Sequence, residues 1–342
     1  MLPALGYAST VSTVRTDRAN STIGGRYALG SVLGDGGTAT VYEATDLRLG
    51  HTVAVKVLHS KHPTADRRME REARVAAGLR HPNVCLITDY GRLEDRTPYL
   101  VMELLVGRTL RELLDEAGSL DAAQVLDIGK QTLSVLHVAH ESGVIHRDIK
   151  PDNLFLSDVV GRPPLVKLLD FGIASADYEE GLTTKGSIVG TPAYMSPEQV
   201  IGARDIDGRA DIYSCAVVLY ECLAGFPPYR AESRRALMEK ILRGGAPQIA
   251  SLRPDVPETL SRAIDTAMRV EREPRFTTAL AMLHVLDGKT ELPEGNWEAE
   301  TERFGPGGVP LKRPAPLDRD RSSLPLPSFD LDDRVDTKTP QR

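Results

Sequence analysis

The chain has 342 residues, 41% of them hydrophobic, and a formal net charge of −6 that arises from 42 basic and 48 acidic residues. This length and apolar share suffice to bury a core, which excludes a chain that is disordered throughout. Because residues of both charge signs are mixed along the chain, no basic surface is expected, and the sequence predicts neither nucleic acid nor anionic lipid as a partner.

The three cysteines, Cys85, Cys215 and Cys222, are too few and too scattered for a disulfide framework or a zinc site, so we expect reduced thiols. No run of about 18 apolar residues occurs, and no membrane span is expected. The N-terminus has no basic stretch followed by an apolar one, and Leu2 excludes the N-myristoylation pattern. A cytoplasmic protein is the remaining expectation.

The two ends of the chain differ in composition from its middle. Residues 1–25 are rich in Ser, Thr and Ala and are predicted to form a flexible arm. Residues 289–342 contain eight of the 23 prolines among mixed charges, which is typical of a disordered tail. The tail is expected to be a spacer, with recruitment of a partner as the alternative. Residues 26–288 are predicted to fold.

The first third of the folded region alternates in the manner of β-strands and is punctuated by glycines. A helix is predicted over about Ala65–Leu79. The predicted strands are Arg26–Leu33, Thr40–Thr45, His51–Leu58, Val84–Tyr90 and Tyr99–Glu103. Together these elements describe a small sheet that carries one helix.

After Gly107 the apolar spacing becomes helical. A helix through Val125–Ala139 is expected to stop at Gly143, and Asp211–Leu223 is apolar nearly all round, as a helix buried inside a larger body would be. A β-rich part followed by an α-rich part predicts an α+β chain with two lobes and a ligand cleft between them.

The glycine-rich segment Leu33–Val41 lies between two predicted strands, where its backbone N–H groups are suited to bind phosphates. Alone this is weak evidence, because most glycine-rich hairpins are ordinary turns. Fifteen residues after Val41, Lys56 ends the apolar run Val53-Ala-Val-Lys. A solvent-facing lysine on an edge strand is the alternative, but the two motifs at this spacing favour a phosphate site.

The segment His146–Asn153 is the most informative in the chain. It contains Asp148, Lys150 and Asn153, and Asp170 follows the apolar run Leu165–Leu169. Transfer of a phosphoryl group needs these residue types, because a carboxylate accepts the hydroxyl proton, a cation contacts the γ-phosphate, and oxygen ligands hold Mg²⁺. Solvated loop residues are the alternative, which a string of this length disfavours.

These motifs resemble those of the eukaryotic-like (Hanks-type) protein kinases, in particular the bacterial serine/threonine kinases, over about Arg26–Gly288. The resemblance implies the two-lobed protein kinase fold, with a small β-rich N-lobe at about 26–103 and a larger α-rich C-lobe at about 107–288. It also implies ATP as the phosphoryl donor, Mg²⁺ with Mn²⁺ as an alternative, and proteins with Ser or Thr hydroxyls as substrates.

Carried over position by position, the resemblance makes Asp148 the catalytic base and Lys150 the cation at the γ-phosphate. It assigns Asn153 and Asp170 to the metal, Lys56 to the α- and β-phosphates, and Glu72 to Lys56. The residues that it places around the nucleotide are Leu33, Gly34, Gly36, Val41, Ala54, Lys56, Met102, Glu103, Leu105, Phe155 and Asp170.

Other matching positions are structural in the family. Asp211 resembles the anchor at the head of the buried helix, Arg275 the partner of Glu198, and His146 a brace of the catalytic loop. The chain departs from the family pattern at Ala39, which replaces the third glycine of the loop. It is also longer than usual between Asn153 and Asp170, with a hairpin tip expected around residues 161–164.

Lys150 and the segment Gly190–Pro192 resemble the features of kinases that act on aliphatic hydroxyls. Arg147, directly before the base, implies control by phosphorylation of the activation segment, since its charge needs an anion. Thr183 and Thr184 are the predicted autophosphorylation sites, with Ser187 also available, and a homodimer would suit that reaction. An unmodified polar loop is the alternative.

Two rival functions are disfavoured by the residues that the chain retains. A catalytically silent kinase-fold scaffold usually lacks the lysine, the base or a metal ligand, and this chain retains Lys56, Asp148, Asn153 and Asp170. A small-molecule phosphotransferase of related fold generally lacks the complete activation segment that the chain carries from Asp170 to Glu198. The sequence therefore predicts an active serine/threonine protein kinase that works in signal transduction.

Overall fold

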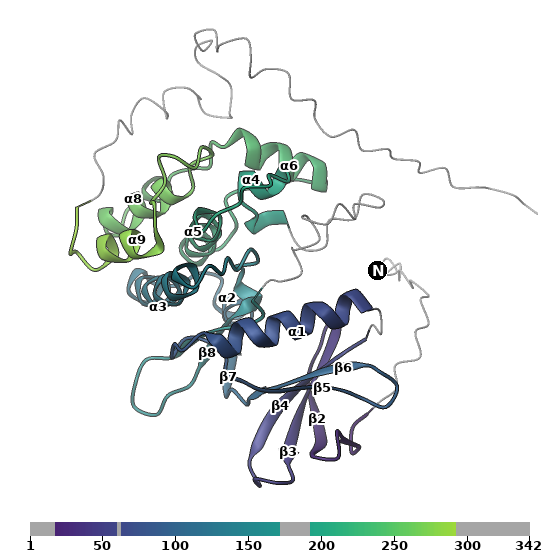
Figure 1. Ribbon diagram of the computed structural model, residues 1–342. Coiled ribbons are helices and arrows are strands. Elements are labelled where there is room, and N and C mark those ends of the chain that lie inside the picture. The colour runs from purple at the N-terminus through teal and green to yellow at the C-terminus, as the bar shows by residue number, and fades with distance from the viewer. Residues whose placement is uncertain (1–17, 60–62, 172–191, 292–342) are drawn as a thin grey trace, which may run out of the picture. The chain divides into compact units, whose positions relative to one another are not determined.

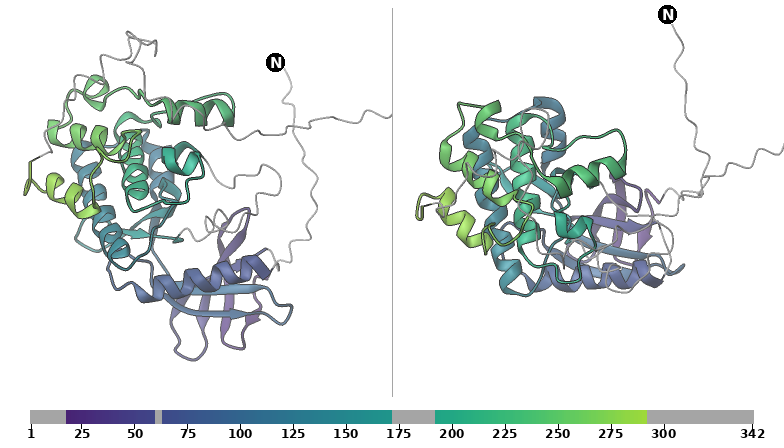
Figure 2. Two further views of the ribbon diagram at one scale, coloured as in Figure 1. Left: turned by 45° about the horizontal axis from the view of Figure 1, so that its top comes forward. Right: turned by 90° about the horizontal axis from the view of Figure 1, so that it is seen from above.

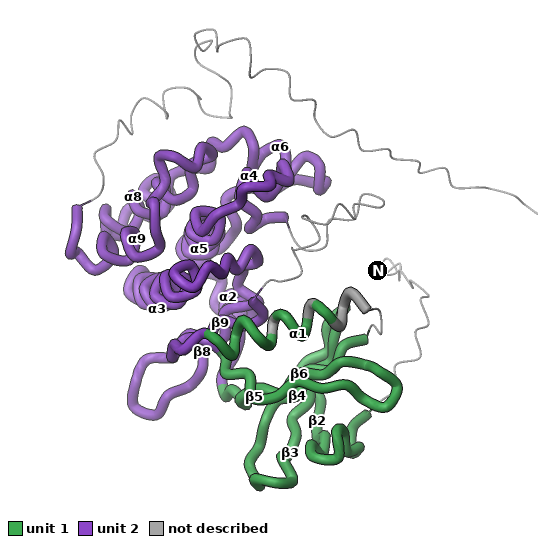
Figure 3. Tube along the Cα trace, in the orientation of Figure 1, with its two compact units in different colours: residues 1–78, 85–106 green, residues 79–84, 107–342 purple. Residues whose placement is uncertain are grey.

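The computed structural model describes residues 18–59, 63–171 and 192–291. Its chain divides into two compact units (Figure 3). Unit 1 takes its described residues from Met1–Gly78 and Cys85–Val106, and unit 2 from Leu79–Val84 and Gly107–Arg342. Each unit has a core of its own.

Unit 1 is a six-stranded antiparallel sheet with one helix lying along it (Figure 1). The strand order is β1-β2-β3-β4-β6-β5. The bounds are β1 Thr22–Ile23, β2 Tyr27–Asp35, β3 Ala39–Asp46, β4 Thr52–Leu58, α1 Pro63–Gly78, β5 Ile87–Arg92 and β6 Pro98–Glu103.

The two faces of this sheet have different cores, and the alternation of side chains along β4 shows why. Val53, Val55 and Val57 point into one cluster of buried aliphatic and tyrosine side chains. Ala54 and Lys56 point to the other face, where Leu100 of β6 packs against the α1 residues Met69 and Ala73. Lys56 therefore lies on the face of the sheet that α1 covers.

The strand predicted over Val84–Tyr90 begins later than expected, and this prediction was wrong at its N-terminal end. The strand starts at Ile87, and Val84, which belongs to unit 2, instead forms an isolated bridge with Leu168 of the same unit. The apolar run Val84–Ile87 is thus divided between the two units, with Val84 in unit 2 and Ile87 in the sheet of unit 1. Its composition could not reveal this division, because both cores accept the same residue types.

Unit 2 is mainly helical, with a three-stranded antiparallel sheet of order β7-β8-β9. Its first elements are β7 Gly107–Thr109, α2 Leu110–Ala117, α3 Ala122–Glu141, η1 Pro151–Asn153, β8 Leu154–Ser157 and β9 Leu165–Leu168. Those after the gap in the described residues are η3 Pro192–Tyr194, α4 Pro197–Val200, α5 Arg209–Ala224, α6 Arg234–Arg243, α7 Ile249–Leu252, α8 Glu258–Ala267 and α9 Ala279–Leu286.

Helix α5 is the centre of unit 2. Every residue from Ala210 to Leu223 is buried, as the sequence predicted from an apolar pattern that runs all round the helix. α5 contacts α3, α7 and α8 (Figure 2). It ends at Gly225, whose φ of 77° lies in the left-handed region that glycine adopts without strain.

The three cysteines are reduced and buried, as expected. Burial raises the pKa of the Cys215 thiol to about 12, so the thiolate is disfavoured and the side chain acts as a small apolar group. None of the helices in the described parts of the chain is long and apolar enough to cross a membrane.

The carboxyl group of Asp265 on α8 is partly buried, which disfavours its ionised form. Burial raises the pKa of Asp265 to about 6, and the hydrogen bond from the backbone of Ile249 offsets only part of this effect. The ordinary pKa of this group is 3.8. Between these two values the folded state keeps a proton that the unfolded state has lost, so its contribution to stability falls as the pH rises through this window.

We therefore expect Asp265→Asn to stabilise the protein at pH 7.5 relative to pH 4.5, by at most about 3 kcal/mol, because the amide carries no charge to bury. Urea denaturation at both pH values measures this difference. Asp255→Asn is the matched control, because Asp255 is 62% exposed and ion-paired with Arg253. Equal effects of Asp265→Asn at the two pH values would contradict the assignment.

Candidate functional site: a catalytic loop anchored by a buried carboxylate

The loop that contains the predicted base is fixed by one carboxylate from α5. Asp211 is fully buried, and its oxygens accept the backbone N–H groups of His146 and Arg147 at 2.8 and 2.7 Å. His140 of α3 contacts the same carboxylate at 2.8 Å. Burial alone would raise the pKa of Asp211, but the hydrogen bonds from His140 and the loop hold it below its ordinary value.

Two successive N–H groups that point at one carboxylate require an unusual backbone. Arg147 has a φ of 65° and Asp170 a φ of 47°, in the left-handed region that is costly for residues with a side chain. Arg147 directly precedes the predicted base Asp148, and Asp170 is itself a predicted metal ligand. A strained backbone of this kind persists where the surrounding contacts hold it in place, and it is frequent at functional sites.

His146 acts as a brace in this structure. Its Nε2 lies 3.1 Å from the carbonyl oxygen of Leu169, which only accepts, so Nε2 carries the proton. Nδ1 accepts the backbone N–H of Asp148 at 3.3 Å. Burial lowers the pKa of His146, which favours this neutral form. The ring therefore links the loop before the base to the end of the segment that precedes Asp170.

The carboxylate of Asp148 is held through one oxygen. Oδ2 accepts from Lys150 Nζ at 2.7 Å and from Asn153 Nδ2 at 3.0 Å. Among the described residues, Oδ1 has no hydrogen-bond donor, and the side chain is 44% exposed. One oxygen thus fixes the orientation while the other is open to a substrate proton.

Asn153 and Asp170, the predicted metal ligands, are connected through the backbone. The amide of Asn153 also donates to the Asp148 carbonyl oxygen at 2.7 Å, which leaves its Oδ1 without a donor among the described residues. Leu169 N–H donates to the Asn153 carbonyl oxygen at 2.9 Å, directly before the exposed Asp170. The structure therefore brings Asp148, Lys150 and Asn153 together and ties the Asp170 segment to them.

A second clamp on the loop comes from α4. Gln199 Nε2 donates to the Arg147 carbonyl oxygen at 2.7 Å. Next to it, Glu198 pairs with Arg275 through two parallel bonds of 2.7 and 2.8 Å, and the guanidinium of Arg275 is fully buried. This pairing was predicted. The contact of Gln199 and that of His140 were not, because nothing in their sequence spacing marks their partners.

A third network holds Tyr194, which follows the segment Gly190–Pro192. Tyr194 Oη donates to Glu221 of α5 at 2.6 Å, and Arg111 of α2 contacts both Tyr194 and Glu221 at 2.8 and 2.9 Å. Glu221 is nearly buried, so these partners offset the cost of its charge. No sequence pattern indicates this network, since its members are widely separated along the chain.

Most of the predicted nucleotide contacts belong to unit 1. Leu33, Gly34 and Gly36 are exposed on the β2–β3 hairpin, and Val41 of β3 pairs with Lys56 of β4. Ala54 is buried and lies opposite Met102 in the register of β4 and β6. Ala39, which replaces the third glycine, is also buried and continues β3 opposite Leu58.

The remaining predicted contacts lie at the end of β6 and on β8. Glu103 ends β6, where its N–H and its carboxylate both bond to the backbone of Leu86, and Leu105 follows it, partly buried. Phe155 is half-buried on β8 of unit 2, opposite Thr109. Glu72 lies in α1, and its side chain is outside the described residues, as are Thr183, Thr184, Ser187 and Gly190.

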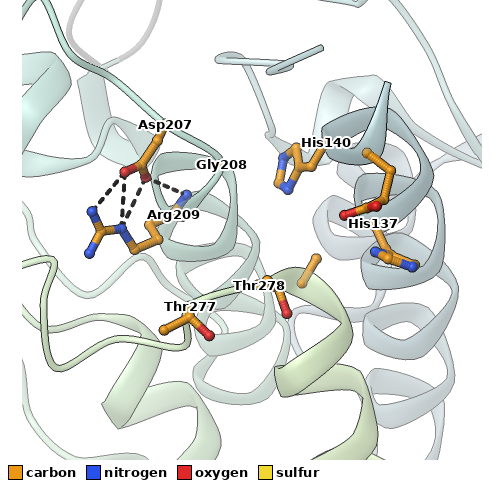
Figure 4. A pocket seen from close by; sticks show the side chains of 9 residues that line it. His137, His140, Asp207, Gly208, Arg209, Thr277 and Thr278 are labelled. Carbon is orange, nitrogen blue, oxygen red and sulfur yellow. Dashed lines mark hydrogen bonds and ion pairs between the residues drawn. The ribbon is translucent and has the colours of Figure 1, made fainter. Parts of the chain in front are cut away.

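A cavity of about 310 Å³ is lined in part by His140, the residue that contacts Asp211. Figure 4 shows His137 and His140 on α3, the Asp207–Arg209 pair before and at the start of α5, and Thr277 and Thr278 before α9. Its lining includes neither Asp148 nor Asn153, and within it Asp207 is paired with Arg209. The cavity is therefore separate from the candidate catalytic site.

Comparison with known proteins supports the geometry. The family model for the protein kinase domain matches residues 27–286. The chain is 40% identical over 270 residues to the serine/threonine-protein kinase PknH of Mycobacterium bovis, covering 77% of this chain and 44% of PknH. It is 40% identical over 259 residues to PknD of Mycobacterium tuberculosis, covering 75% of this chain and 38% of PknD. The chain thus spans less than half the length of these curated relatives.

Solved structures agree in fold. The PknI kinase domain of Mycobacterium tuberculosis matches with a TM-score of 0.61 and 26% identity, covering 80% of this chain and 98% of that domain. Rad53 in complex with AMP-PNP matches with a TM-score of 0.63 and 27% identity, covering 75% of this chain and 64% of Rad53. The family resemblance and the two-lobed fold predicted from the sequence are confirmed. The chain belongs to the protein kinase family, among the serine/threonine kinases of bacterial type.

Proposed function

We propose that the chain transfers the γ-phosphoryl group of ATP to serine or threonine hydroxyls of protein substrates. The observation that carries this proposal is the arrangement at Asp148. Its Oδ2 is fixed by Lys150 and Asn153, and its Oδ1 is open. A base needs this combination, because its carboxylate must be oriented and must still have a lone pair available for the substrate proton.

In the proposed reaction the substrate hydroxyl oxygen forms a bond to the γ-phosphorus, and the bond to the β–γ bridging oxygen breaks. ADP leaves with that electron pair, and Asp148 takes the hydroxyl proton. Lys150, which contacts Asp148 in this structure, offers its remaining N–H groups to the γ-phosphate oxygens. Lys56 and the glycine-rich hairpin of unit 1 hold the other phosphates.

Protein kinases in general use ATP with a divalent cation, and the residues here fit such an ion. The open Oδ1 of Asn153 and the exposed carboxylate of Asp170 are hard oxygen donors, which suit Mg²⁺. Among the described residues no group of three His, Cys, Asp or Glu side chains forms a cage of its own. We propose Mg²⁺, with Asn153 and Asp170 as protein ligands and phosphate oxygens as the others, supplying charge neutralisation when bound.

The rival function is a catalytically silent scaffold. It is disfavoured because the described catalytic residues are both present and mutually hydrogen-bonded, and a scaffold has no need to keep the Asp148–Lys150–Asn153 contacts. We also propose that the substrates are proteins with serine or threonine hydroxyls and that autophosphorylation takes place within a homodimer. The cytoplasmic location stays a prediction of the sequence.

Asp148→Asn should lower the rate of phosphoryl transfer by about 100-fold to 10,000-fold, because the amide does not accept the hydroxyl proton. The purified protein is incubated with γ-labelled ATP, Mg²⁺ and a generic basic protein, and label incorporation is measured. Asp152→Asn is the matched control, since Asp152 is an exposed aspartate in the same loop and should leave the rate nearly unchanged. A wild-type rate in Asp148→Asn would refute the assigned base.

Autophosphorylation at Thr183 or Thr184 is expected, since Arg147 implies an anion on the activation segment. Mass spectrometry of wild-type protein incubated with ATP and Mg²⁺ should find phosphate on at least one of these residues. The Lys56→Met variant, prepared in the same way, should carry none. A fully active wild-type sample with both threonines unmodified would count against this mode of regulation.

A further inference from the structure

A single histidine ties the tip of the glycine-rich hairpin to the end of β4. His59 directly follows β4, and its backbone N–H donates to the Thr38 carbonyl oxygen at 2.8 Å, which extends the β3–β4 ladder by one bond. Its ring then reaches across the hairpin. Nε2 lies 2.8 Å from Thr40 Oγ1, and Nδ1 lies 3.3 Å from the Gly37 carbonyl oxygen.

The roles of donor and acceptor in this network follow from its chemistry. Thr40 Oγ1 donates its one hydrogen to Asp35 Oδ1 at 2.9 Å, so it accepts from Nε2 of His59. The Gly37 carbonyl only accepts, so Nδ1 also donates. Nε2 of His59 also lies 3.6 Å from Asp35 Oδ1, and both side chains are about one third exposed.

The network lies on the sheet face opposite to Lys56. Thr40 pairs with Val57 in the register of β3 and β4, and Val57 points into the tyrosine-containing core. Side chains alternate along a strand, so His59 lies on the same face as Val57, whereas Lys56 lies on the other. His59 and Thr40 therefore do not compete with Lys56 for a phosphate.

The hairpin tip has little else to hold it. Gly36 and Gly37 have no side chains, and glycine loses more conformational freedom on ordering than any other residue. Within the tip, the Gly36 N–H donates to the Ala39 carbonyl oxygen at 3.0 Å. The side chain of His59, directly after β4, adds links to Gly37 and to Thr40 of β3, and Thr40 is bonded in turn to Asp35 at the end of β2.

We propose that His59 and Thr40 are positioning residues that hold the glycine-rich hairpin in the shape that receives the nucleotide phosphates. This inference rests on the proposed function, because it assigns these residues a part in ATP binding. If the hairpin is ordered before binding, the free energy of nucleotide binding does not include the entropic cost of ordering it. Breaking the network should therefore weaken nucleotide binding while the rate of transfer at saturating ATP stays close to that of the wild type.

The test compares Thr40→Val and His59→Ala with two conservative variants. Thr40→Ser keeps the hydroxyl, and His59→Gln keeps a side-chain N–H donor in its amide. Thr45→Val and His51→Ala are matched controls, because both residues are exposed on or beside the same strands and lie away from the hairpin tip. For each full-length variant we measure the Kd of AMP-PNP with Mg²⁺, the KM for ATP, kcat and the melting temperature.

Thr40→Val and His59→Ala should each raise the Kd and KM for nucleotide about threefold to tenfold, with kcat within about twofold of wild type, since one or two hydrogen bonds are lost. Thr40→Ser should restore most of the affinity. The double variant should bind about as weakly as the weaker single variant, because both changes break one network.

Three results separate the inference from the proposed function. A wild-type protein that neither binds AMP-PNP nor transfers phosphate overturns both. A wild-type protein that does both, with Thr40→Val and His59→Ala indistinguishable from the control variants, overturns the inference alone. Equal weakening by Thr40→Val and Thr40→Ser also overturns it, since the hydroxyl would then not be the cause.

Discussion

The candidate site depends on the buried carboxylate of Asp211. An ionised carboxylate without solvent is costly unless donors surround it, and here the donors are the loop N–H groups of His146 and Arg147 together with His140. The requirement to satisfy this charge fixes the loop backbone, including the positive φ of Arg147. Asp211 is at the start of α5, in which every residue from Ala210 to Leu223 is buried. The hydrogen bonds to Asp211 therefore attach the loop to the core of unit 2.

Much of this organisation was readable from the sequence, because it has local causes. The run Val53-Ala-Val-Lys predicted a strand that carries Lys56, and the all-round apolar pattern predicted a buried helix at Asp211–Leu223. Asp148, Lys150 and Asn153 were assigned to one site from their residue types and the family resemblance, and in the structure their side chains are hydrogen-bonded. Short-range patterns of this kind survive folding because the chain itself sets the separation.

What the sequence could not reveal are contacts whose partners are distant in the chain. Gln199 reaches Arg147 across 52 positions, and Glu221 reaches Arg111 across 110. An isolated glutamine or arginine has many equivalent partners until the fold selects one. The late start of β5 has a related cause, since Val84 lies in unit 2 and forms a bridge with Leu168 of β9 there. Such choices depend on tertiary competition, which local propensity does not encode.

The central claim is that Asp211 places Asp148 for phosphoryl transfer without itself contacting a substrate. The most direct measurement is the single-turnover rate of transfer from saturating γ-labelled ATP to a protein substrate in Asp211→Asn, a nearly isosteric change that turns an accepting oxygen into a donor facing the loop N–H groups. The account predicts a loss of about 100-fold in this rate, because a small displacement of the base is sufficient, with AMP-PNP affinity within about twofold of wild type. A folded variant that transfers phosphate at the wild-type rate would contradict it.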